Sequence, residues 1–313
     1  MLKIAVVGLG IIGAEHLRAI RTSKMLELVA VCDVNEMRAK SVSEEYGVPY
    51  FLDYKQIPGS VEVDAVVLNL PHGLHCESTV YFLEAGLDVF LEKPMANTLE
   101  ECDRIIEASQ RTGRKVAVGH IQRFFSVNRI VKDYISSGKL GRLFAINEIR
   151  SINYFVPQRP AWFFSKSMAG GGIVMNYGAH ALDKMLYITG EHVEDVQACC
   201  GNFLRGQEIE GHAQFLVKLS GGISATVTFS GYSSVGYETT YIGTHGSLTV
   251  TGNLVKVCHN GESNILCNGL DSNYMLRELE EFARFVCGER NEMPNAEYGR
   301  EIIFAIEKIY GAK

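Results

Sequence analysis

Residues 2–13, Leu2-Lys-Ile-Ala-Val-Val-Gly8-Leu-Gly10-Ile-Ile-Gly13, decide the fold of this chain. The first six residues form an apolar run with the length of a buried strand, and residues 14–20 continue with helical spacing. At such a turn Gly8 permits a sharp bend, Gly10 leaves room for a pyrophosphate, and Gly13 lets the helix pack closely on the strand. We therefore predict a dinucleotide-binding turn, in which the free N–H groups at the helix start, at Ile11, Ile12 and Gly13, bind phosphate.

An acidic residue, Asp33, stands 20 residues after Gly13, at the end of a second apolar run over residues 28–32. A carboxylate in this place accepts hydrogen bonds from the ribose hydroxyls and repels a 2′-phosphate. Val34 and Asn35 follow it, where an NADP-binding turn would carry Arg or Lys, so NAD is favoured as the cofactor. Arg38 is near enough in sequence to keep NADP open.

Short apolar runs alternate with helical patterns from residue 2 to about residue 119. Runs such as 64–68 and 115–118 are apolar at consecutive positions, which is typical of strands covered on both faces. The alternation predicts an α/β fold that begins with a Rossmann domain over residues 1–121, a doubly wound parallel sheet.

Beyond residue 121 strand-like runs follow one another and are separated by glycines. This pattern predicts a C-terminal α+β domain over residues 122–313, with a mostly antiparallel open sheet. Its expected strands are 143–152, 193–201, 212–219, 223–229, 237–242 and 247–250, and its expected helices are 127–136, 173–188, 274–287 and 296–310.

Composition and charge exclude several classes of protein. The 313 residues are 47% hydrophobic and 21% charged, with a formal charge of −6 and no run of like charges, so nucleic acid is not an expected partner. The eight cysteines contain no C-x-x-C pair, and their spacing indicates neither a zinc site nor a disulfide framework. No apolar run reaches about 18 residues, so we expect no membrane partner and a cytoplasmic location.

Polar residues follow the strands, at the edge where parallel sheets bind ligands. Asn69, Pro71 and His75 follow the run 64–68, and we expect their loop to line the cofactor. His72 and His75 also form a His-x-x-His pair, but no third ligand stands at helix spacing, so we predict no metal.

The run 88–91 leads into Glu92-Lys93-Pro94. Pro94 disfavours the helical conformation at Lys93, so the lysine stays extended at the sheet edge that faces the expected nicotinamide. A solvated surface lysine is the alternative interpretation. His120 and Arg123, after the next run, stand at the domain junction.

A third group follows Gly170-Gly-Gly. At 100° per residue Asn176, His180 and Asp183 fall on one helical face, beside an apolar stripe that should be buried. The stripe consists of Met175, Ala179, Leu182 and Leu186. A merely solvated polar face is the alternative interpretation.

These motifs together resemble the glucose-fructose oxidoreductase, inositol dehydrogenase and rhizopine-catabolism family (Gfo/Idh/MocA). The similarity joins Gly8–Gly13, Asn69-Leu-Pro71 with His75, Glu92-Lys93-Pro94, His120-x-x-Arg123, and Trp162 with the Gly170–Asp183 segment. It implies an oxidoreductase with a nicotinamide cofactor, a sugar, polyol or related small-molecule substrate, and dimers or tetramers built through the C-terminal sheet.

The resemblance also implies residue roles. Lys93 matches the family's catalytic lysine and His180 its catalytic histidine, while Glu92 and His120 join the cofactor-binding residues. Asn176 stands where many sugar and inositol dehydrogenases carry Asp, and an amide orients a hydroxyl but cannot accept its proton. Asp183 is expected to hold the imidazole of His180. The remaining candidates for the substrate wall are Arg123, Tyr154, Trp162 and Tyr177.

Two other functions stay open at this point. A non-catalytic NAD- or sugar-sensing regulator uses the same architecture, and Asn176 favours it mildly. Reduction of an imine or a conjugated double bond uses the same hydride geometry.

Overall fold

The computed structural model describes residues 1–269 and 272–311, which divide into two compact units. The first holds Met1–Ile121 and Ser272–Arg300; the second, as far as it is described, holds Gln122–Asp271 and Glu301–Lys313. The first unit thus includes residues 272–300, which the sequence analysis assigned to the second domain. Two contacts explain this difference: helix α8 (Tyr274–Cys287) packs on helix α1 (Ile11–Thr22), and Val118 N–H donates to the Pro294 carbonyl at 2.9 Å.

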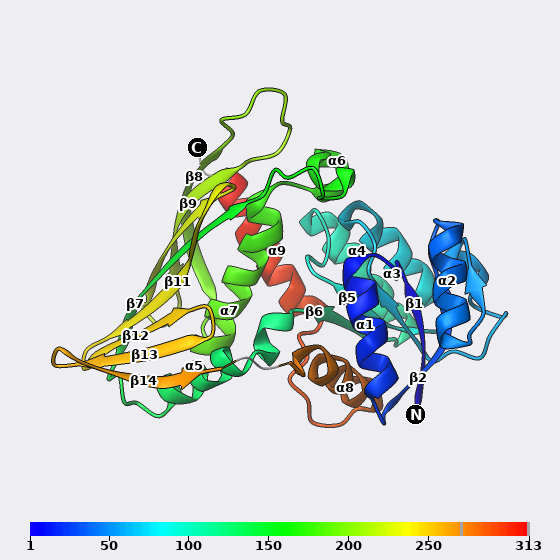
Figure 1. Cartoon of the computed structure of the whole chain (residues 1–313), viewed down its shortest axis with the longest axis horizontal. Coiled ribbons are helices and arrows are strands. Elements are labelled where there is room, and N and C mark those ends of the chain that lie inside the picture. Colours follow the sequence, from blue (N-terminus) through cyan, green and yellow to red (C-terminus); the bar gives the residue numbers. More distant parts are fainter. Residues whose placement is uncertain (270–271, 312–313) are drawn as a thin grey trace. The chain divides into compact units, whose positions relative to one another are not determined.

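The first unit is built on a six-stranded parallel sheet of order β3-β2-β1-β4-β5-β6 (Figure 1). The strands are β1 (Leu2–Val7), β2 (Leu26–Cys32), β3 (Tyr50–Phe51), β4 (Ala65–Leu68), β5 (Asp88–Glu92) and β6 (Val116–Gly119). The other helices are α2 (Glu36–Tyr46), α3 (His75–Glu84) and α4 (Leu99–Thr112). Strand order reverses between β1 and β4, the point at which such sheets bind nucleotides. The predicted doubly wound sheet is confirmed.

The second unit is built on an eight-stranded sheet of order β14-β13-β12-β11-β7-β10-β9-β8, antiparallel except for the parallel pair β7 and β10. Its strands are β7 (Leu143–Asn153), β8 (Val193–Gly201), β9 (His212–Leu219), β10 (Ser224–Ser230), β11 (Tyr232–Gly243), β12 (Gly246–Thr251), β13 (Leu254–His259) and β14 (Glu262–Asn268). Helices α5 (Ser126–Ser136) and α7 (Ala179–Thr189) cover one side of the sheet, with α6 (Lys166–Ala169) near one end (Figure 1). Helix α9 (Ala296–Gly311) closes the chain. The mostly antiparallel sheet is confirmed, and β13 and β14 extend it beyond the predicted strands.

The expected helix over 173–188 differs in its first turn. Val174–Gly178 form a π-helical turn before α7 begins, so the spacing of 100° per residue does not apply between Asn176 and His180. The apolar stripe is nevertheless buried as predicted, because Met175, Ala179, Leu182 and Leu186 are at most 3% exposed.

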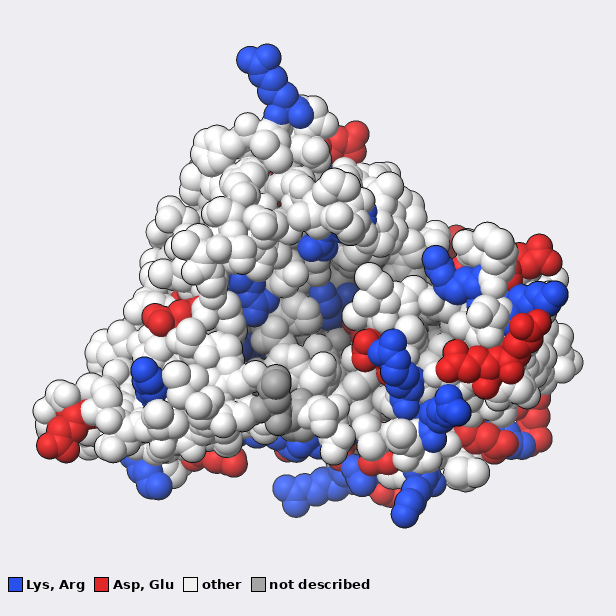
Figure 2. Space-filling view, viewed as in Figure 1, with Lys and Arg blue, Asp and Glu red and all other residues white. Residues whose placement is uncertain are grey.

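Charges of both signs are interspersed over the visible surface of the first unit (Figure 2). Neither sign forms a large patch there, in keeping with the small net charge of −6. In the described part of the chain, every helix is too short or too polar to span a bilayer. All eight cysteines are free thiols.

A carboxylate holds the glycine segment in front of the π turn. Glu210 accepts hydrogen bonds from the N–H groups of Gly172 (2.9 and 2.8 Å) and Val174 (2.8 Å) and from the Tyr310 hydroxyl (3.0 Å). The N–H groups at a helix start have no partner within the helix, so this carboxylate satisfies them and complements the positive end of the helix.

Replacing Glu210 by Ala is expected to lower the free energy of unfolding by about 2–4 kcal/mol, because two N–H groups and a hydroxyl lose a charged acceptor. Tyr310→Phe, which removes the hydroxyl bond to Glu210 and the acceptor of the Met175 N–H, should cost about 1–3 kcal/mol. Urea unfolding measures both. Glu208→Ala, two residues away and exposed, is the matched control, and an equal loss in that variant would contradict the assignment.

Candidate functional site

The glycine turn after β1 brings three backbone segments together. A Cβ on Gly8, whose φ is +87°, would lie 2.4 Å from the Asn69 carbonyl oxygen. A Cβ on Gly13 would lie 2.0 Å from the Gly8 oxygen, so helix and strand touch through backbone alone. Gly10, by contrast, has no atom within 4 Å of such a Cβ, which leaves open space above the turn.

Helix α1 begins at this turn without a side-chain cap and without an acidic residue in its first turn. Ile11 is 74% and Ile12 43% exposed, so solvent reaches the turn that bears the unpaired N–H groups. Unpaired N–H groups and the positive end of a helix make a binding site for an anion such as pyrophosphate. The residues present therefore fit a dinucleotide.

Asp33 lies at the end of β2 and is 7% exposed. Its carboxylate accepts the Leu9 N–H at 2.9 Å and the Asn35 N–H at 2.8 Å, which fixes its orientation beside the glycine turn. Arg38 donates to the same carboxylate at 3.0 Å. Arg38 thus stands where the sequence kept NADP open, but it is paired with the acid that disfavours a 2′-phosphate.

The loop after β4 is tied to the loop after β5 by His75. Its buried ring faces two main-chain oxygens, that of Pro94 at 2.8 Å and that of Leu70 at 2.9 Å. Burial lowers the pKa of this imidazole. Pro71 precedes a short 3₁₀ turn, His72–Leu74. The side chain of His75 thus braces the two loops, and contact of this loop with a cofactor stays a prediction.

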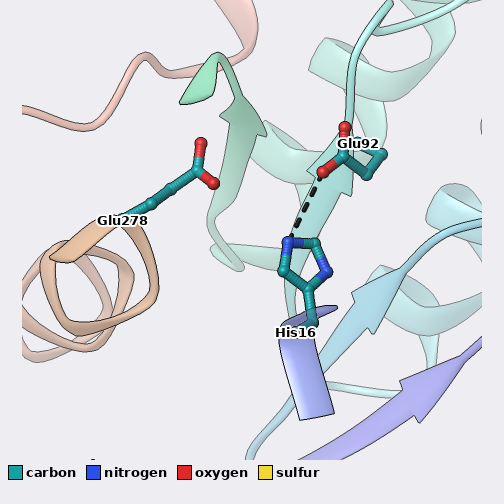
Figure 3. A group of neighbouring side chains, drawn as sticks. All are labelled: His16, Glu92 and Glu278. Carbon is teal, nitrogen blue, oxygen red and sulfur yellow. Dashed lines mark ion pairs between the residues drawn. The ribbon is translucent and has the colours of Figure 1, made fainter. Parts of the chain in front are cut away.

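Lys93 follows directly on β5 and is partly exposed. The Lys93–Pro94 peptide bond is cis. The Lys93 N–H donates to the Glu92 carboxylate at 3.1 Å, and burial raises the pKa of Glu92 to about 7. The other carboxylate oxygen of Glu92 faces His16 of α1 (Figure 3).

His16 and Glu278 were not among the predicted residues. His16 stands three residues after Gly13, and a polar residue on the buried face of the first helix was a signal that the sequence contained. Glu278, on α8, comes from a segment that the sequence assigned to the other domain, so no local pattern pointed to it.

Two predicted residues meet in a buried ion pair. Arg123 Nε donates to Asp183 Oδ1 at 2.7 Å, and its guanidinium lies over the Tyr187 ring at 5.2 Å. Arg123 is 8% exposed and Asp183 is fully buried. The pair anchors the short helical turn after β6 on α7; contact of Arg123 with a substrate, and support of His180 by Asp183, stay predictions. His120, just before this turn, is 1% exposed and packs edge-on against Tyr298.

The second unit gathers aromatic rings around the π turn. Tyr154 is fully buried, and its pKa rises to about 12 because of that burial. Asn176 shares a side-chain hydrogen bond with the Tyr154 hydroxyl and is 8% exposed. The Tyr177 ring lies 6.2 Å from that of Tyr154 and 6.3 Å from that of His180, so these four residues form one group.

Trp162, the last predicted wall residue, lies in a 3₁₀ turn, Ala161–Phe164, and is partly exposed. Its ring stacks on Phe163 with 3.8 Å between ring centroids. A flat, partly exposed indole suits the C–H face of a sugar ring.

The chain is similar in sequence to several dehydrogenases. It is 30% identical over 233 residues to 1-carboxy-3-chloro-3,4-dihydroxycyclo hexa-1,5-diene dehydrogenase of Comamonas testosteroni, which covers 74% of this chain and 58% of that protein. It is 34% identical over 145 residues to inositol 2-dehydrogenase of Salmonella paratyphi B, a match that covers 45% of this chain and 43% of that protein. It is 31% identical over 193 residues to D-glucoside 3-dehydrogenase of Escherichia coli, a match that covers 60% of this chain and 54% of that protein. The chain thus spans about half the length of these relatives.

Solved structures share the whole fold. Aldose-aldose oxidoreductase of Caulobacter crescentus, complexed with glycerol, superposes with a TM-score of 0.90 at 23% identity over 99% of this chain and 97% of that one. Levoglucosan dehydrogenase, in complex with NADH, superposes with a TM-score of 0.89 at 17% identity, over 99% of this chain and 96% of that one.

Two family models cover most of the sequence. Residues 2–120 match the model described as an oxidoreductase family with an NAD-binding Rossmann fold, and residues 128–249 match the GFO/IDH/MocA C-terminal domain. The two domains occur here in one chain and in the order that the motifs predicted. The chain belongs to the Gfo/Idh/MocA family of oxidoreductases.

Proposed function

We propose that this chain is an NAD-dependent dehydrogenase or reductase that acts on a CH–OH or carbonyl carbon of a sugar, polyol or related small molecule. The observation that supports this best is Lys93, presented directly after β5 in the unit whose open glycine turn and Asp33 fit NAD. The second unit supplies His180 and Asn176.

Residues of the first unit would hold the cofactor. The uncapped start of α1 would bind the pyrophosphate over Gly10, and Asp33 would accept the ribose hydroxyls. NAD, when bound, accepts the hydride in the oxidising direction and supplies it in the reducing direction.

Lys93 would stabilise the substrate oxygen. When a carbon loses hydride, its hydroxyl must lose a proton, and negative charge develops on the oxygen. An ammonium group beside that oxygen lowers the pKa of the alcohol and, in reverse, polarises the carbonyl.

His180 would move the proton, because an imidazole exchanges protons near neutral pH. Asn176 would orient a neighbouring hydroxyl, since its amide donates and accepts hydrogen bonds but takes no proton. The proposal requires Lys93 and His180 to converge on one substrate oxygen.

The substrate class follows from chemistry that the relatives' names share. Inositol, a glucoside and a dihydroxycyclohexadiene all carry hydroxyl groups on a six-membered ring. Trp162 and Tyr177, both partly exposed, are suited to such a ring, whose C–H face stacks on an aromatic side chain. We therefore propose a cyclic polyol or pyranose.

A sensor that binds NAD or a sugar without turnover is the second candidate. The observation in its favour is Asn176, which stands where many of these dehydrogenases carry Asp. Equilibrium binding of NAD, combined with a spectrophotometric scan for NADH formation across polyols and aldoses, separates the two. Tight binding of NAD without turnover would favour the sensor.

Removing either proposed catalytic group should abolish most turnover. Lys93→Ala and His180→Ala are each expected to lower kcat about 10²- to 10⁴-fold, because each removes charge stabilisation or proton transfer in the transition state. NADH formation with the substrate found in the scan measures this. Lys55→Ala, an exposed lysine paired with Glu77, is the control. Wild-type turnover in both folded variants would refute the assignment.

Cofactor preference should depend on Asp33. Asp33→Ser removes the charge that repels a 2′-phosphate and frees Arg38 to bind it, so the ratio of kcat/KM for NADP to that for NAD should rise about tenfold or more. Glu44→Ser, at an exposed position of α2, is the control. An unchanged ratio in Asp33→Ser would show that this carboxylate does not select the cofactor.

We further propose a cytoplasmic homodimer or homotetramer that assembles through the open face of the eight-stranded sheet. The eight free thiols suit a reducing compartment. Ile149 on β7 and Leu216 on β9 are 57% and 39% exposed on the face opposite the buried Glu148 and Phe215. Exposed apolar residues on one face of a sheet are typical of an interface.

Ile149→Glu places a charge on this face and should shift the protein to a smaller oligomer, because burying an unpaired carboxylate is costly. Light scattering after gel filtration measures the mass. Met37→Glu, which alters an 82% exposed residue of α2, should leave the mass unchanged. An unchanged mass in Ile149→Glu would contradict assembly through this face.

A further inference from the structure

A partly buried line of polar contacts joins the glycine turn to Lys93. His16 Nδ1 lies 2.8 Å from Asn69 Oδ1, and His16 Nε2 lies 3.5 Å from Glu92 Oε1. The second oxygen of Glu92 accepts the Lys93 N–H at 3.1 Å. Asn69 is the residue whose carbonyl crowds Gly8, so the line begins at the cofactor turn.

The direction of the first bond determines the state of His16. The amide oxygen of Asn69 only accepts, so His16 Nδ1 is the donor and carries the hydrogen. His16 is fully buried and packs edge-on against Phe90, and burial lowers its pKa to about 4. The imidazole is therefore neutral at physiological pH, and Nε2 presents a lone pair toward Glu92.

A lone pair facing a carboxylate requires a proton between them. Burial raises the pKa of Glu92 to about 7, the neighbouring charge of Lys93 opposing the shift, so this carboxyl binds a proton readily. Glu278 of α8 is fully buried, and its carboxylate, Glu92 and His16 each place an atom within 4.8 Å of the others (Figure 3). A second carboxylate at this distance also favours a proton on the first.

Surrounding backbone keeps the carboxyl of Glu92 in this place. A Cβ on Gly119 of β6 would lie 3.4 Å from the Glu92 carboxyl carbon and 2.8 Å from the Phe90 ring. Among the described residues, the titratable groups beside Glu92 are His16 from α1, Glu278 from α8 and Lys93, and the bare backbone of β6 lies next to its carboxyl carbon.

We propose that His16 is a positioning residue: by sharing one proton with Glu92 it anchors the carboxyl that holds the backbone of Lys93, and so couples the cofactor turn to the lysine. The coupling to catalysis rests on the proposed function, in which Lys93 stabilises the substrate oxygen. The proton shared by His16 and Glu92 is independent of that function.

Unfolding as a function of pH tests the shared proton without any substrate. The pKa of His16 falls from 6.5 to about 4 on folding, so it stabilises the fold increasingly as pH rises from about 4 to 6.5. The pKa of Glu92 rises from 4.5 to about 7 on folding. Its contribution to the stability of the fold is therefore present below pH 4.5 and is lost as pH rises to about 7. In the wild type these opposite slopes cancel between about 4.5 and 6.5.

Single substitutions should reveal how each residue changes the dependence of stability on pH. Relative to the wild type, His16→Gln should lose stability as pH rises through this window, and Glu92→Gln should gain it, each with a slope of about one proton. The double variant should follow the wild-type slope. The coupling between the two substitutions should be present below pH 7 and fade above it, whereas a purely structural contact would give a coupling independent of pH.

A matched control comes from the second unit. His192 Nδ1 lies 3.0 Å from Glu301, but its side chain is 75% exposed. His192→Gln should change neither slope. Parallel slopes in all variants, or equal effects at His192, would overturn the proposal.

A divalent metal ion in place of the proton is the competing explanation. Elemental analysis of the protein purified without chelator decides it. About one equivalent of metal in the wild type that is lost in His16→Gln would overturn the proposal, and no bound metal supports it.

Turnover tests the link to Lys93. His16→Gln should lower kcat about tenfold with KM for NAD changed less than threefold, because Lys93 is misplaced while the glycine turn remains. Glu92→Gln, which keeps a donor toward His16 and an acceptor for Lys93 N–H, should lose less activity than Glu92→Ala. If the slopes appear but Lys93→Ala retains full turnover, the shared proton stands and the proposed function fails.

Discussion

The contact on which the first unit depends is that between two stretches of bare backbone, at Gly8 and Gly13. A side chain at Gly13 would lie 2.0 Å from the Gly8 oxygen, so only glycine lets α1 start this close to β1. This closeness sets the position of everything that α1 carries. It leaves the helix start open to an anion, and one turn later it places His16 against Asn69 and Glu92.

In the second unit, a buried ion pair fixes a helix on the sheet, whereas in the first unit close backbone contact does so. Glu148 on β7 and Lys184 on α7 form an ion pair of 2.6 Å, with both side chains at most 1% exposed, and Thr239 of β11 donates a hydrogen bond to the same carboxylate. This pair fixes α7 on the sheet, and the neighbouring Asp183 ties α7 through Arg123 to the helical turn after β6. Breaking such a pair leaves a buried charge uncompensated, so the helix that carries His180 has little freedom to shift.

Much of the fold was predictable because the first domain follows local rules. Continuous apolar runs, glycines at a turn and an acid 20 residues later each have one physical explanation, and they agree with one another. The glycine turn, Asp33 and the edge position of Lys93 followed from them. Other features depended on contacts between distant segments. The π turn at Val174–Gly178 has no periodic signal, and Glu278 reaches the Glu92 carboxyl only because residues 272–300 return to the first unit. Arg123 and Asp183 were predicted as site residues, but 60 positions separate them, and no local pattern announced their bond.

The contact of Tyr310 with the glycine segment has a consequence for how the chain folds during synthesis. The Tyr310 hydroxyl occupies the space over Gly171, where a Cβ would meet it at 1.9 Å, and it binds both Glu210 and the Met175 N–H. Synthesis proceeds from the amino end, and domains generally fold in that order. The first strands and the glycine turn are synthesised long before Tyr310, so the segment that leads into His180 reaches its final packing only after α9 has been synthesised.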